Sequence, residues 1–553
     1  MNLLQEIKKY IFIILLAELC SSLAGQSERL IYHDIKTDPS GKIIPWYSPD
    51  PGKSYSHIVS LIWDFWDKMR RDINGTPYYM NHQIWDSATN DPRGIGGDQI
   101  QMALSSWRLL YQYSGNQRIR ENMKFMADYY ISNAFSTSDC KWPDIPFPYN
   151  TLVYSGKYDG DMILGKGFTQ PDKAGSFGIE LVRMYKMFSG ERYPNITDDI
   201  YLETAVKIAN TLAARTNIGD ENNSPLPFKV NVFTGETGRL INDNRANGKA
   251  EFCTYTSNWT GTMELFLELC ELGKGDTALY KTAFTRILNW MKKYPLKTNK
   301  WGPFFEDVPG WSDTQINAIT FARFIMDHHE YFPEWKKDVE GIFNWVYKTL
   351  GNRKWEKYGV VVINEQTAYQ IPGNSHTARQ ASAELQYVML SGDTVRKQNA
   401  IRQLNWATYM VDADGKNLYP QAKIWLTDGY GDYVRHYLRA MSYCDDILPL
   451  GEDHIISSSS VVQQVDLGNR NEKNDSSGAI TGRSEFILRY SVFDLSGTER
   501  ILLAAKPSKV RVDKKILEEG KSTVHDSYEW KPLKNGGILT VHRINGNTVT
   551  IYY

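Results

Sequence analysis

Hydrophobic residues recur at helical spacing over most of the chain, in pairs of helices that a short break separates. The first helix of five pairs ends in the segments LLYQYSGN, RMYKMFSGE, LELCELGKG, FIMDHHEYFPE and LQYVMLSGD. Glycine directly after a helix is a common C-cap, because it adopts the left-handed conformation without strain, and proline cannot continue a helix. The pattern therefore predicts five helical hairpins, in each of which the first helix ends at one of these breaks.

A second amphipathic stretch follows each break, in IRENMKFMADYY, YLETAVKIANTL, YKTAFTRILNWMKK, VEGIFNWVYKTL and AIRQLNWATYM. Two further amphipathic helices, over residues 54–71 and 427–442, have no partner within their own part of the chain. Helical repeats bury their hydrophobic faces only against neighbouring repeats. We therefore predict that these two helices form a sixth hairpin. The result is a mainly α-helical (α/α)6 toroid, in which the first, more uniformly apolar helix of each hairpin lies inside.

Beyond residue 447 the hydrophobic pattern changes from helical spacing to strict alternation. Segments such as EFILRYSVFD, GGILTVHRI and NTVTIYY alternate apolar and polar residues between clusters of Gly, Asn, Asp and Ser. This pattern is typical of antiparallel strands joined by tight turns. We predict a toroid over residues 54–447 and a small antiparallel β-sandwich over residues 455–553. The sandwich carries few candidate catalytic groups, so we expect it to support or cap the ring.

The N-terminus has the composition of a secretory signal peptide. Lys8 and Lys9 precede the short apolar run YIFIILLAELC, and the following SSLAG supplies small residues for cleavage. The apolar run is too short for a comfortable membrane span. We predict a signal peptide over residues 1–24 and a leader over residues 25–53, and hence a secreted or periplasmic protein without a membrane span.

Composition narrows the range of partners. The chain has 63 Lys and Arg against 64 Asp and Glu, with no basic stripe, which argues against nucleic acid as a partner. The five cysteines are scattered without CxxC spacing, so neither a disulfide framework nor a zinc site is indicated. We expect a monomer without a cofactor; the segment DADGKN leaves a structural calcium ion open beside the simpler interpretation as a surface turn.

Long polar loops precede the six inner helices, and a closed ring gathers them at one rim. Each polar or aromatic residue there also has a structural explanation, as an N-cap or as part of the core. Their convergence on one face of a rigid scaffold, together with 16 Trp and 34 Tyr, favours a pocket for an acidic oligo- or polysaccharide. The candidates for substrate binding are Trp85, Asp98, Arg245, Tyr255, Trp259, Trp311, Tyr369, Arg379, Trp425, Tyr433 and His436.

Two of these loops carry the segments GNSHTARQAS and WLTDGYGDYVRH, which resemble active-site segments of the secreted bacterial (α/α)-toroid polysaccharide lyases and glycoside hydrolases. The resemblance covers most of the mature chain at the level of architecture. One candidate family is the lyases that remove rhamnose from glucuronate. Toroid lyases use Asn or Arg, His and Tyr, so the resemblance implies the catalytic residues Asn374, His376, Tyr430 and Arg435. In some such lyases Asn and His are adjacent, whereas here Ser375 separates them, which leaves the base open between His376 and a tyrosine.

Two reactions stay open at this point. A lyase that works by β-elimination needs a group to neutralise the uronate carboxylate, a base for the C5 proton and an acid for the leaving oxygen. A hydrolase needs two carboxylates that flank the scissile bond. His, Tyr and Arg concentrate in the last two loops, which favours the lyase. The third alternative is a non-catalytic glycan-binding protein or a toroid isomerase. The acids that a hydrolase could use are Asp98, Glu251, Glu306, Asp313, Glu365 and Asp428.

Overall fold

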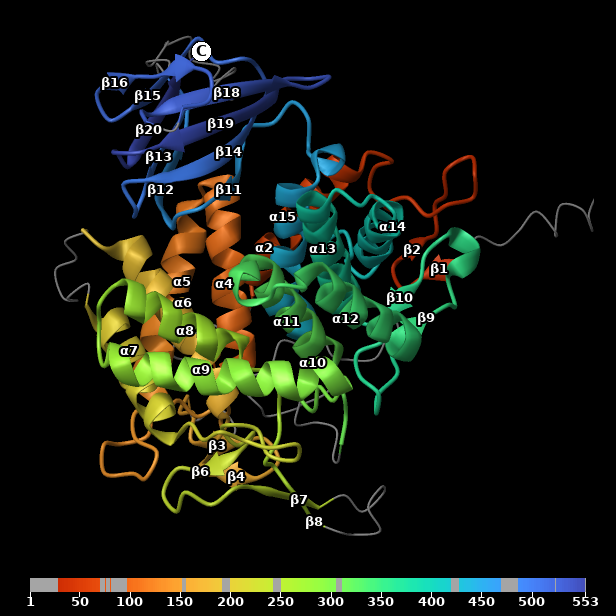
Figure 1. Cartoon of the computed structure of the whole chain (residues 1–553). Helices are drawn as coiled ribbons and strands as arrows, with labels where there is room; N and C mark the ends of the chain where they lie inside the picture. Colours follow the sequence, from red (N-terminus) through yellow and green to blue (C-terminus); the bar gives the residue numbers. More distant parts are fainter. Residues whose placement is uncertain are drawn as a thin grey trace, which may run out of the picture.

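The structure of the chain is a computed structural model. It describes residues 28–69, 75, 80, 97–151, 156–190, 199–241, 250–304, 311–418, 427–468, 486–522 and 524–552, except the side chains of residues 97–98, 241, 250–251 and 427–431. Within these residues twelve long helices form a ring, and a β-sandwich follows at the C-terminal end of the chain (Figure 1). The predicted signal peptide lies outside the described residues.

Six inner helices contact one another in sequence around the ring, and the last contacts the first, so the ring is closed. The inner helices are α4 (Gly97–Ser114), α6 (Pro171–Phe188), α8 (Thr260–Glu271), α11 (Gln315–Asp327), α13 (Asn374–Ser391) and α15 (Thr427–Tyr443). The outer helices are α2 (Pro51–Asp67), α5 (Gln117–Asn133), α7 (Ile200–Arg215), α9 (Thr277–Lys293), α12 (Trp335–Leu350) and α14 (Lys397–Thr408). The short helix α10 (Pro295–Thr298) follows α9.

Helix α2 packs against α15, which confirms the predicted sixth hairpin between the first and last helices of the ring. Local sequence fixes where these helices begin and end. The Asp50 side chain caps α2 by accepting hydrogen bonds from the backbone N–H groups of Gly52 and Lys53, and Pro51 occupies the first helical turn. Helix α13 ends at Gly392, which takes the left-handed conformation with φ of 77°.

Two glycines let α6 and α8 approach closely. A Cβ atom at Gly261 would lie 2.5 Å from the Ser176 Oγ, and one at Gly175 would collide with the Thr262 side chain. Large aromatic residues fill the other spaces between helices. The largest fully buried tryptophans are Trp66, Trp107, Trp259, Trp290, Trp301 and Trp406. Much of the aromatic content therefore belongs to packing rather than to a sugar site.

The β-sandwich consists of two five-stranded sheets with strand orders β11-β14-β19-β18-β17 and β12-β13-β20-β15-β16. All of its strand pairs are antiparallel except β17 and β18. The strands are β11 (His454–Ser458), β12 (Val462–Leu467), β13 (Phe486–Val492), β14 (Gly497–Leu503), β15 (Lys509–Val512), β16 (Lys515–Ile516), β17 (Glu518–Glu519), β18 (Ser527–Pro532), β19 (Gly537–Arg543) and β20 (Thr548–Tyr552).

The sandwich lies at one end of the ring, where β11 contacts α4 and α15, and β12 contacts α4 and α6. Short hairpins lie at the opposite end, among the loops that precede the inner helices (Figure 1). The short strands of the described chain are β1 (Arg29–Leu30), β2 (His33–Asp34), β3 (Gly160–Asp161), β4 (Gly165–Lys166), β5 (Phe168–Thr169), β6 (Val230–Asn231), β7 (Arg239–Ile241), β8 (Ala250–Phe252), β9 (Gly351–Asn352) and β10 (Val362–Ile363). The two ends of the ring are thus unlike.

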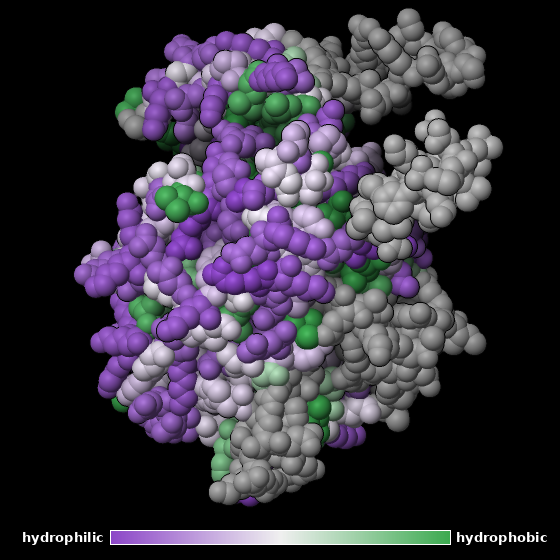
Figure 2. Space-filling view, turned by 90° about the vertical axis from the view of Figure 1, so that its right-hand side faces the viewer, coloured by the Kyte–Doolittle hydropathy of each residue, from purple (hydrophilic) through white to green (hydrophobic). Residues whose placement is uncertain are grey.

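The outer surface is mainly polar on the side that Figure 2 shows, and hydrophobic residues form small separate groups on its coloured part. None of the described helices is both long and apolar enough to span a bilayer. The cysteines of the described chain, Cys140, Cys253, Cys270 and Cys444, are all free thiols.

Candidate functional site

A cavity of about 260 Å³ lies inside the ring, and all six inner helices contribute to its wall. It extends from the second turns of the inner helices, at Gln101 and Ser176, to their last turns, at Asp327 and Tyr443. Its volume is close to that of a small-molecule pocket. The fold therefore provides a ligand-sized space on the axis of the ring.

Many charged residues line the wall of this cavity. Three carboxylates, those of Glu180, Glu264 and Asp327, are outnumbered by arginines. The five lining arginines are Arg183, Arg323, Arg379, Arg435 and Arg439. The excess of positive charge, enclosed by protein, favours an anionic ligand.

A buried carboxylate organises the side of the cavity formed by α13 and α15. Asp432 accepts hydrogen bonds from Arg379, Arg435 and, at 3.1 Å, from the His436 Nε2. Residues three and four apart share one face of a helix, so Arg435 and His436 meet Asp432 within α15, while Arg379 reaches it from α13. Burial alone would raise the pKa of Asp432, but Arg379 and Arg435 hold it well below its usual range.

His436 lines the cavity and combines two properties of a general base. Burial lowers its pKa well below the usual value, although Asp432 works against this shift, so the imidazole is neutral at pH 7. The Asp432 carboxylate only accepts hydrogen bonds, so the Nε2 of the neutral ring carries the proton. The Nδ1 then carries a lone pair; it is buried and has no hydrogen-bond partner in the described part of the chain, so a ligand must fill the cavity closely to reach it. A neutral histidine oriented by a carboxylate in this way can take a proton from a ligand.

The other lining acids are held by different partners. Glu180 accepts a hydrogen bond of 2.5 Å from the Arg183 Nη1 and lies 3.7 Å from the Arg108 Nε. Burial would raise the pKa of Glu180, but these two arginines lower it overall. Burial and the neighbouring Glu264 raise the pKa of Asp327. The cavity thus contains one carboxyl group with a lowered pKa and one with a raised pKa.

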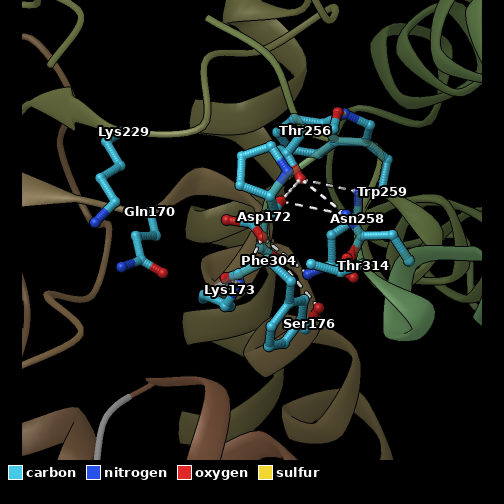
Figure 3. Close-up of polar contacts among 12 residues, drawn as sticks. Gln170, Asp172, Lys173, Ser176, Lys229, Thr256, Asn258, Trp259, Phe304 and Thr314 are labelled. Atoms are coloured by element: carbon cyan, nitrogen blue, oxygen red, sulfur yellow. Dashed lines mark hydrogen bonds and ion pairs between the residues drawn. The ribbon is translucent and has the colours of Figure 1, made fainter. Parts of the chain in front are cut away.

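A buried ion pair fixes the wall near the first turn of α6 (Figure 3). The Lys173 Nζ lies 2.8 Å from the Asp172 Oδ2, donates to the Phe304 carbonyl at 2.9 Å and stands 3.4 Å from the centre of the Phe304 ring. Asn258 donates to the same Asp172 oxygen at 2.8 Å. Asp172 and Lys173 are almost fully buried, whereas Asn258 and Phe304 line the cavity. The pair therefore holds two loops in place around the entrance to α6.

The structure brings three of the sequence-predicted residues to the cavity, namely Arg379, Arg435 and His436. Asn374 and His376 lie nearby in the first turn of α13 but are not among the described residues that line it. The Asn374 Nδ2 donates to the Asn417 Oδ1 at 2.5 Å. His376 is buried, and burial together with Arg379 lowers its pKa well below the usual value.

Tyr255, Trp259 and Tyr433 are buried, and each of them donates a hydrogen bond to a backbone carbonyl. The structure therefore gives them packing roles between helices and loops and leaves almost no ring surface for stacking on a sugar. Their positions beside the starts of inner helices are like those of the cavity residues, so sequence alone does not separate the two groups.

Trp311 and Tyr369 are more exposed, at 40% and 39%, but they are not among the described lining residues. The Trp311 Nε1 donates to the Asp313 Oδ2 at 3.0 Å, and the Lys300 Nζ lies 4.8 Å from the centre of the Trp311 ring. The remaining predicted residues, whose side chains lie outside the described part of the structure, are Trp85, Asp98, Arg245, Trp425 and Tyr430.

Sequence reasoning missed the charged residues farther along the inner helices. Glu180 and Arg183 lie in the middle of α6, Arg323 lies in α11, and Arg439 lies in the second half of α15. The available signal was a charge within an otherwise apolar inner helix, as Arg323 is in QINAITFARFIMD. These residues lie outside the loops that precede the inner helices, because the cavity continues down the axis of the ring.

No protein-family model and no curated protein matches the chain. Solved structures do match. A cellobiose 2-epimerase from Spirochaeta thermophila DSM 6192 has a TM-score of 0.51 and 13% identity, over 72% of this chain and 98% of that chain. A sugar epimerase from a ruminal bacterium has a TM-score of 0.50 and 13% identity, over 71% and 98%. At this identity the likeness shows the fold alone, and it confirms the predicted (α/α)6 toroid.

Proposed function

We propose that this chain is an enzyme that acts on an acidic carbohydrate and removes the proton beside a uronate carboxylate, in a β-elimination reaction. The observation that carries the proposal is the Asp432–His436 pair in the wall of an arginine-rich cavity. β-Elimination needs a base for a weakly acidic carbon and positive charge for the carboxylate that becomes enolate-like. Both kinds of group line this cavity.

In this reaction the His436 Nδ1 takes the proton from C5 of the uronate. The electron pair of the C5–H bond forms a double bond between C4 and C5, and the C4–O bond breaks. Asp432 keeps the imidazole oriented and stabilises the imidazolium that forms. The leaving oxygen needs a proton, and for this step we propose Tyr430, one of the catalytic residues that the resemblance implies.

The base in this proposal differs from the one that the resemblance implies. His376 is not among the described residues that line the cavity, whereas His436 is. A candidate base must come within hydrogen-bond reach of the proton that it abstracts. We therefore assign the base to His436 and a supporting role to His376.

The matching structures also support an enzyme that acts on sugars, because one is a sugar epimerase and the other a cellobiose 2-epimerase. Epimerisation next to a carbonyl carbon begins with the same step, the removal of a proton by a base. The two reactions differ in the second step: the carbanion-like intermediate either expels a leaving group or takes a proton back. The same histidine would serve in both.

A second candidate, a glycoside hydrolase, is favoured by one specific observation. Asp327 and Glu180 both line the cavity, and their surroundings shift their pKa values in opposite directions. Such a difference assigns a general acid and a carboxylate that acts as base or nucleophile. Against this alternative, Glu180 is held by two arginines, which lower its basicity.

One incubation separates the three reactions. The full chain is mixed with uronate-containing oligosaccharides in parallel in deuterated water and in water labelled with oxygen-18. β-Elimination gives an unsaturated product that absorbs ultraviolet light and takes up no oxygen-18. Hydrolysis gives a saturated product with oxygen-18, and epimerisation gives an uncleaved sugar that carries deuterium. A saturated, oxygen-18-labelled product, or an uncleaved deuterated sugar, would overturn the lyase proposal.

The matched controls for this assay are two histidine variants. His436→Ala should abolish the unsaturated product. His525→Ala changes an exposed histidine of the β-sandwich and should leave product formation unchanged.

A further inference from the structure

The base of the cavity, where α11 and α15 end, contains arginines with a different environment from those around Asp432. Arg439 and Tyr443 lie one helical turn apart on α15, and Arg323 approaches them from α11. All three line the cavity. The Tyr443 hydroxyl lies beside the Arg323 guanidinium.

These two arginines have no carboxylate of their own. Arg323 is buried, and it donates hydrogen bonds to the neutral side chains of Gln386, at 2.9 Å, and Ser382. Its Nε has no hydrogen-bond partner among the residues that the structure describes. The Arg439 guanidinium makes neither an ion pair nor a hydrogen bond within the described chain.

The charges around Arg439 also favour the binding of an anion. Burial and the nearby charges of Arg323 and Arg435 lower its pKa to about 9. Asp327, an acid of the same part of the cavity wall, accepts a hydrogen bond from Gln386 at 2.6 Å; Arg323 and Arg439 lower its pKa, but burial and Glu264 raise it overall. Arg439 is only partly exposed, and a charge that is withdrawn from water without a partner costs free energy, which an anionic ligand would recover.

We propose that Arg323, Arg439 and Tyr443 form the binding site for the carboxylate of a uronic acid at the base of the cavity. The proposal deepens the proposed function and rests on it only for the class of sugar. Arginine binds carboxylates through two parallel hydrogen bonds, and the protonated Tyr443 hydroxyl can donate a third.

The position of this site suits the chemistry of His436. Arg439 follows His436 by three residues, which corresponds to about 4.5 Å along the helix axis. A carboxylate held at Arg439 would place the carbon next to it closer to the histidine. This spacing is what abstraction of a proton beside a carboxylate requires.

The sandwich limits what can lie beyond the site. A second cavity of about 280 Å³ shares Arg439 and Tyr443 with the first, and Ser457 and Ser458 of β11 form part of its wall. The β11 strand therefore stands behind the two residues at the end of the ring. This arrangement favours a uronate at the reducing end of the substrate, whose O4 carries the leaving sugar and whose carboxylate points inward, over the middle of a long polysaccharide.

The test measures binding instead of turnover, so that it can fail independently of the proposed reaction. Free glucuronate and galacturonate are titrated into the full chain by calorimetry, with glucose and galactose as uncharged controls. We expect the wild-type protein to bind at least one uronate about 10-fold or more tightly than the matching neutral sugar. Arg439→Gln should remove most of this preference, and Arg439→Lys should restore part of it.

Arg353→Gln is the matched control, because it removes the same charge from an exposed position where Arg353 pairs with Glu356. It should leave the preference unchanged. Tyr443→Phe should weaken uronate binding by a few-fold and leave the neutral sugar unaffected. Thermal unfolding of each variant shows whether it is folded. If Arg439→Gln does not fold, the uronate preference of Tyr443→Phe is the deciding measurement.

Three results would overturn the proposal: a wild-type protein that binds neither uronate, equal affinity for uronates and neutral sugars, or an unchanged preference in the folded Arg439 variant. If Arg439→Gln does not fold, an unchanged preference for uronates in Tyr443→Phe would also overturn the proposal. The expected binding pattern without an unsaturated product would count against the β-elimination alone.

Discussion

The cavity contains two sets of arginines that differ in their partners. Arg379 and Arg435 share the carboxylate of Asp432, and Arg435 also donates to the Ser105 Oγ at 2.9 Å. Arg323 and Arg439, at the base, have no ion-pair partner within the described residues. The first set is held in ion pairs with a carboxylate before any ligand binds, whereas the second has only the longer-range attraction of Asp327.

This difference suggests separate roles for the two sets: one positions His436, and the other binds the ligand. A guanidinium that is already paired with a carboxylate holds that carboxylate in place, and here it thereby orients His436. An unpaired guanidinium attracts a ligand, because the ligand supplies the missing charge. The resemblance implies a catalytic role for Arg435, whereas our proposal places the uronate carboxylate one turn farther along α15, at Arg439.

The largest effect should come from breaking the compensated set. Asp432→Asn would leave Arg379 and Arg435 buried without their counter-ion, and breaking such a pair costs about 3–5 kcal/mol. We expect the free energy of unfolding, measured by urea denaturation, to fall by this amount. Arg439→Gln should leave it unchanged or raise it, because that change removes an uncompensated charge. A loss of stability in Arg439→Gln as large as that in Asp432→Asn would contradict the distinction between the two sets.

The next effect concerns the base that Asp432 orients. His436→Ala should lower turnover of a uronate glycan by about 100-fold or more, the usual contribution of a positioned base. His376→Ala should cost less, because His376 is not among the described residues that line the cavity. Steady-state kinetics of the two variants, with circular dichroism to verify folding, provide the comparison. Full activity in His436→Ala with an inactive His376→Ala would return the base to the residue that the resemblance implies.

A smaller effect distinguishes the two sets by substrate. Arg439→Gln should reduce kcat/KM for an acidic substrate by about 10- to 100-fold, the range expected for the loss of a hydrogen bond between charged groups. Arg435→Gln should act mainly through kcat, because it disturbs the orientation of His436 instead of the contact with the carboxylate. The measurement is kcat and KM for each variant on one uronate glycan. Equal changes in KM in both variants would show that the two arginines do the same thing.

The smallest effect is on stability in mild acid. The pKa values of His436 and His376 are lowered in the folded protein, so between pH 7 and their folded values the unfolded chain binds more protons. Stability should therefore fall as the pH drops below about 6.5, by at most about 1.4 kcal/mol per pH unit for each histidine. Burial lowers the pKa of His328, but its hydrogen bond to Glu264 raises it overall, so this residue opposes the trend.

Urea denaturation between pH 7.5 and 5.5 measures this dependence, and His436→Ala should make it less steep. Stability that rises on acidification, or a slope that the variant does not change, would show that His436 is not buried in its neutral form.

The ring and its closure could be predicted, because they depend on local patterns. Helical periodicity, the glycines after the first helices and the change to alternation past residue 447 each involve only neighbouring residues. Even the contact between α2 and α15 could be inferred from the need to bury two unpartnered helices. The fold was thus accessible at the level of helices and strands.

The roles of single residues in the cavity were less accessible, because they depend on contacts between distant segments. The i to i+3 spacing of Asp432 and Arg435 is visible in the sequence, but the second arginine on Asp432 comes from α13. Likewise Trp259 and Trp311 both lie beside starts of inner helices, and yet one is buried and the other is 40% exposed. Such differences arise from packing in three dimensions, which local pattern does not encode.

The most direct test of the account is a crystal structure of the protein with glucuronate or galacturonate bound. We predict that the sugar carboxylate lies within hydrogen-bond distance of Arg439 and Arg323, with the carbon next to it facing the His436 Nδ1. A carboxylate bound instead to Arg435 or Arg379, with Arg439 still unpartnered, would contradict the central claim that the uncompensated arginines recognise the acidic sugar.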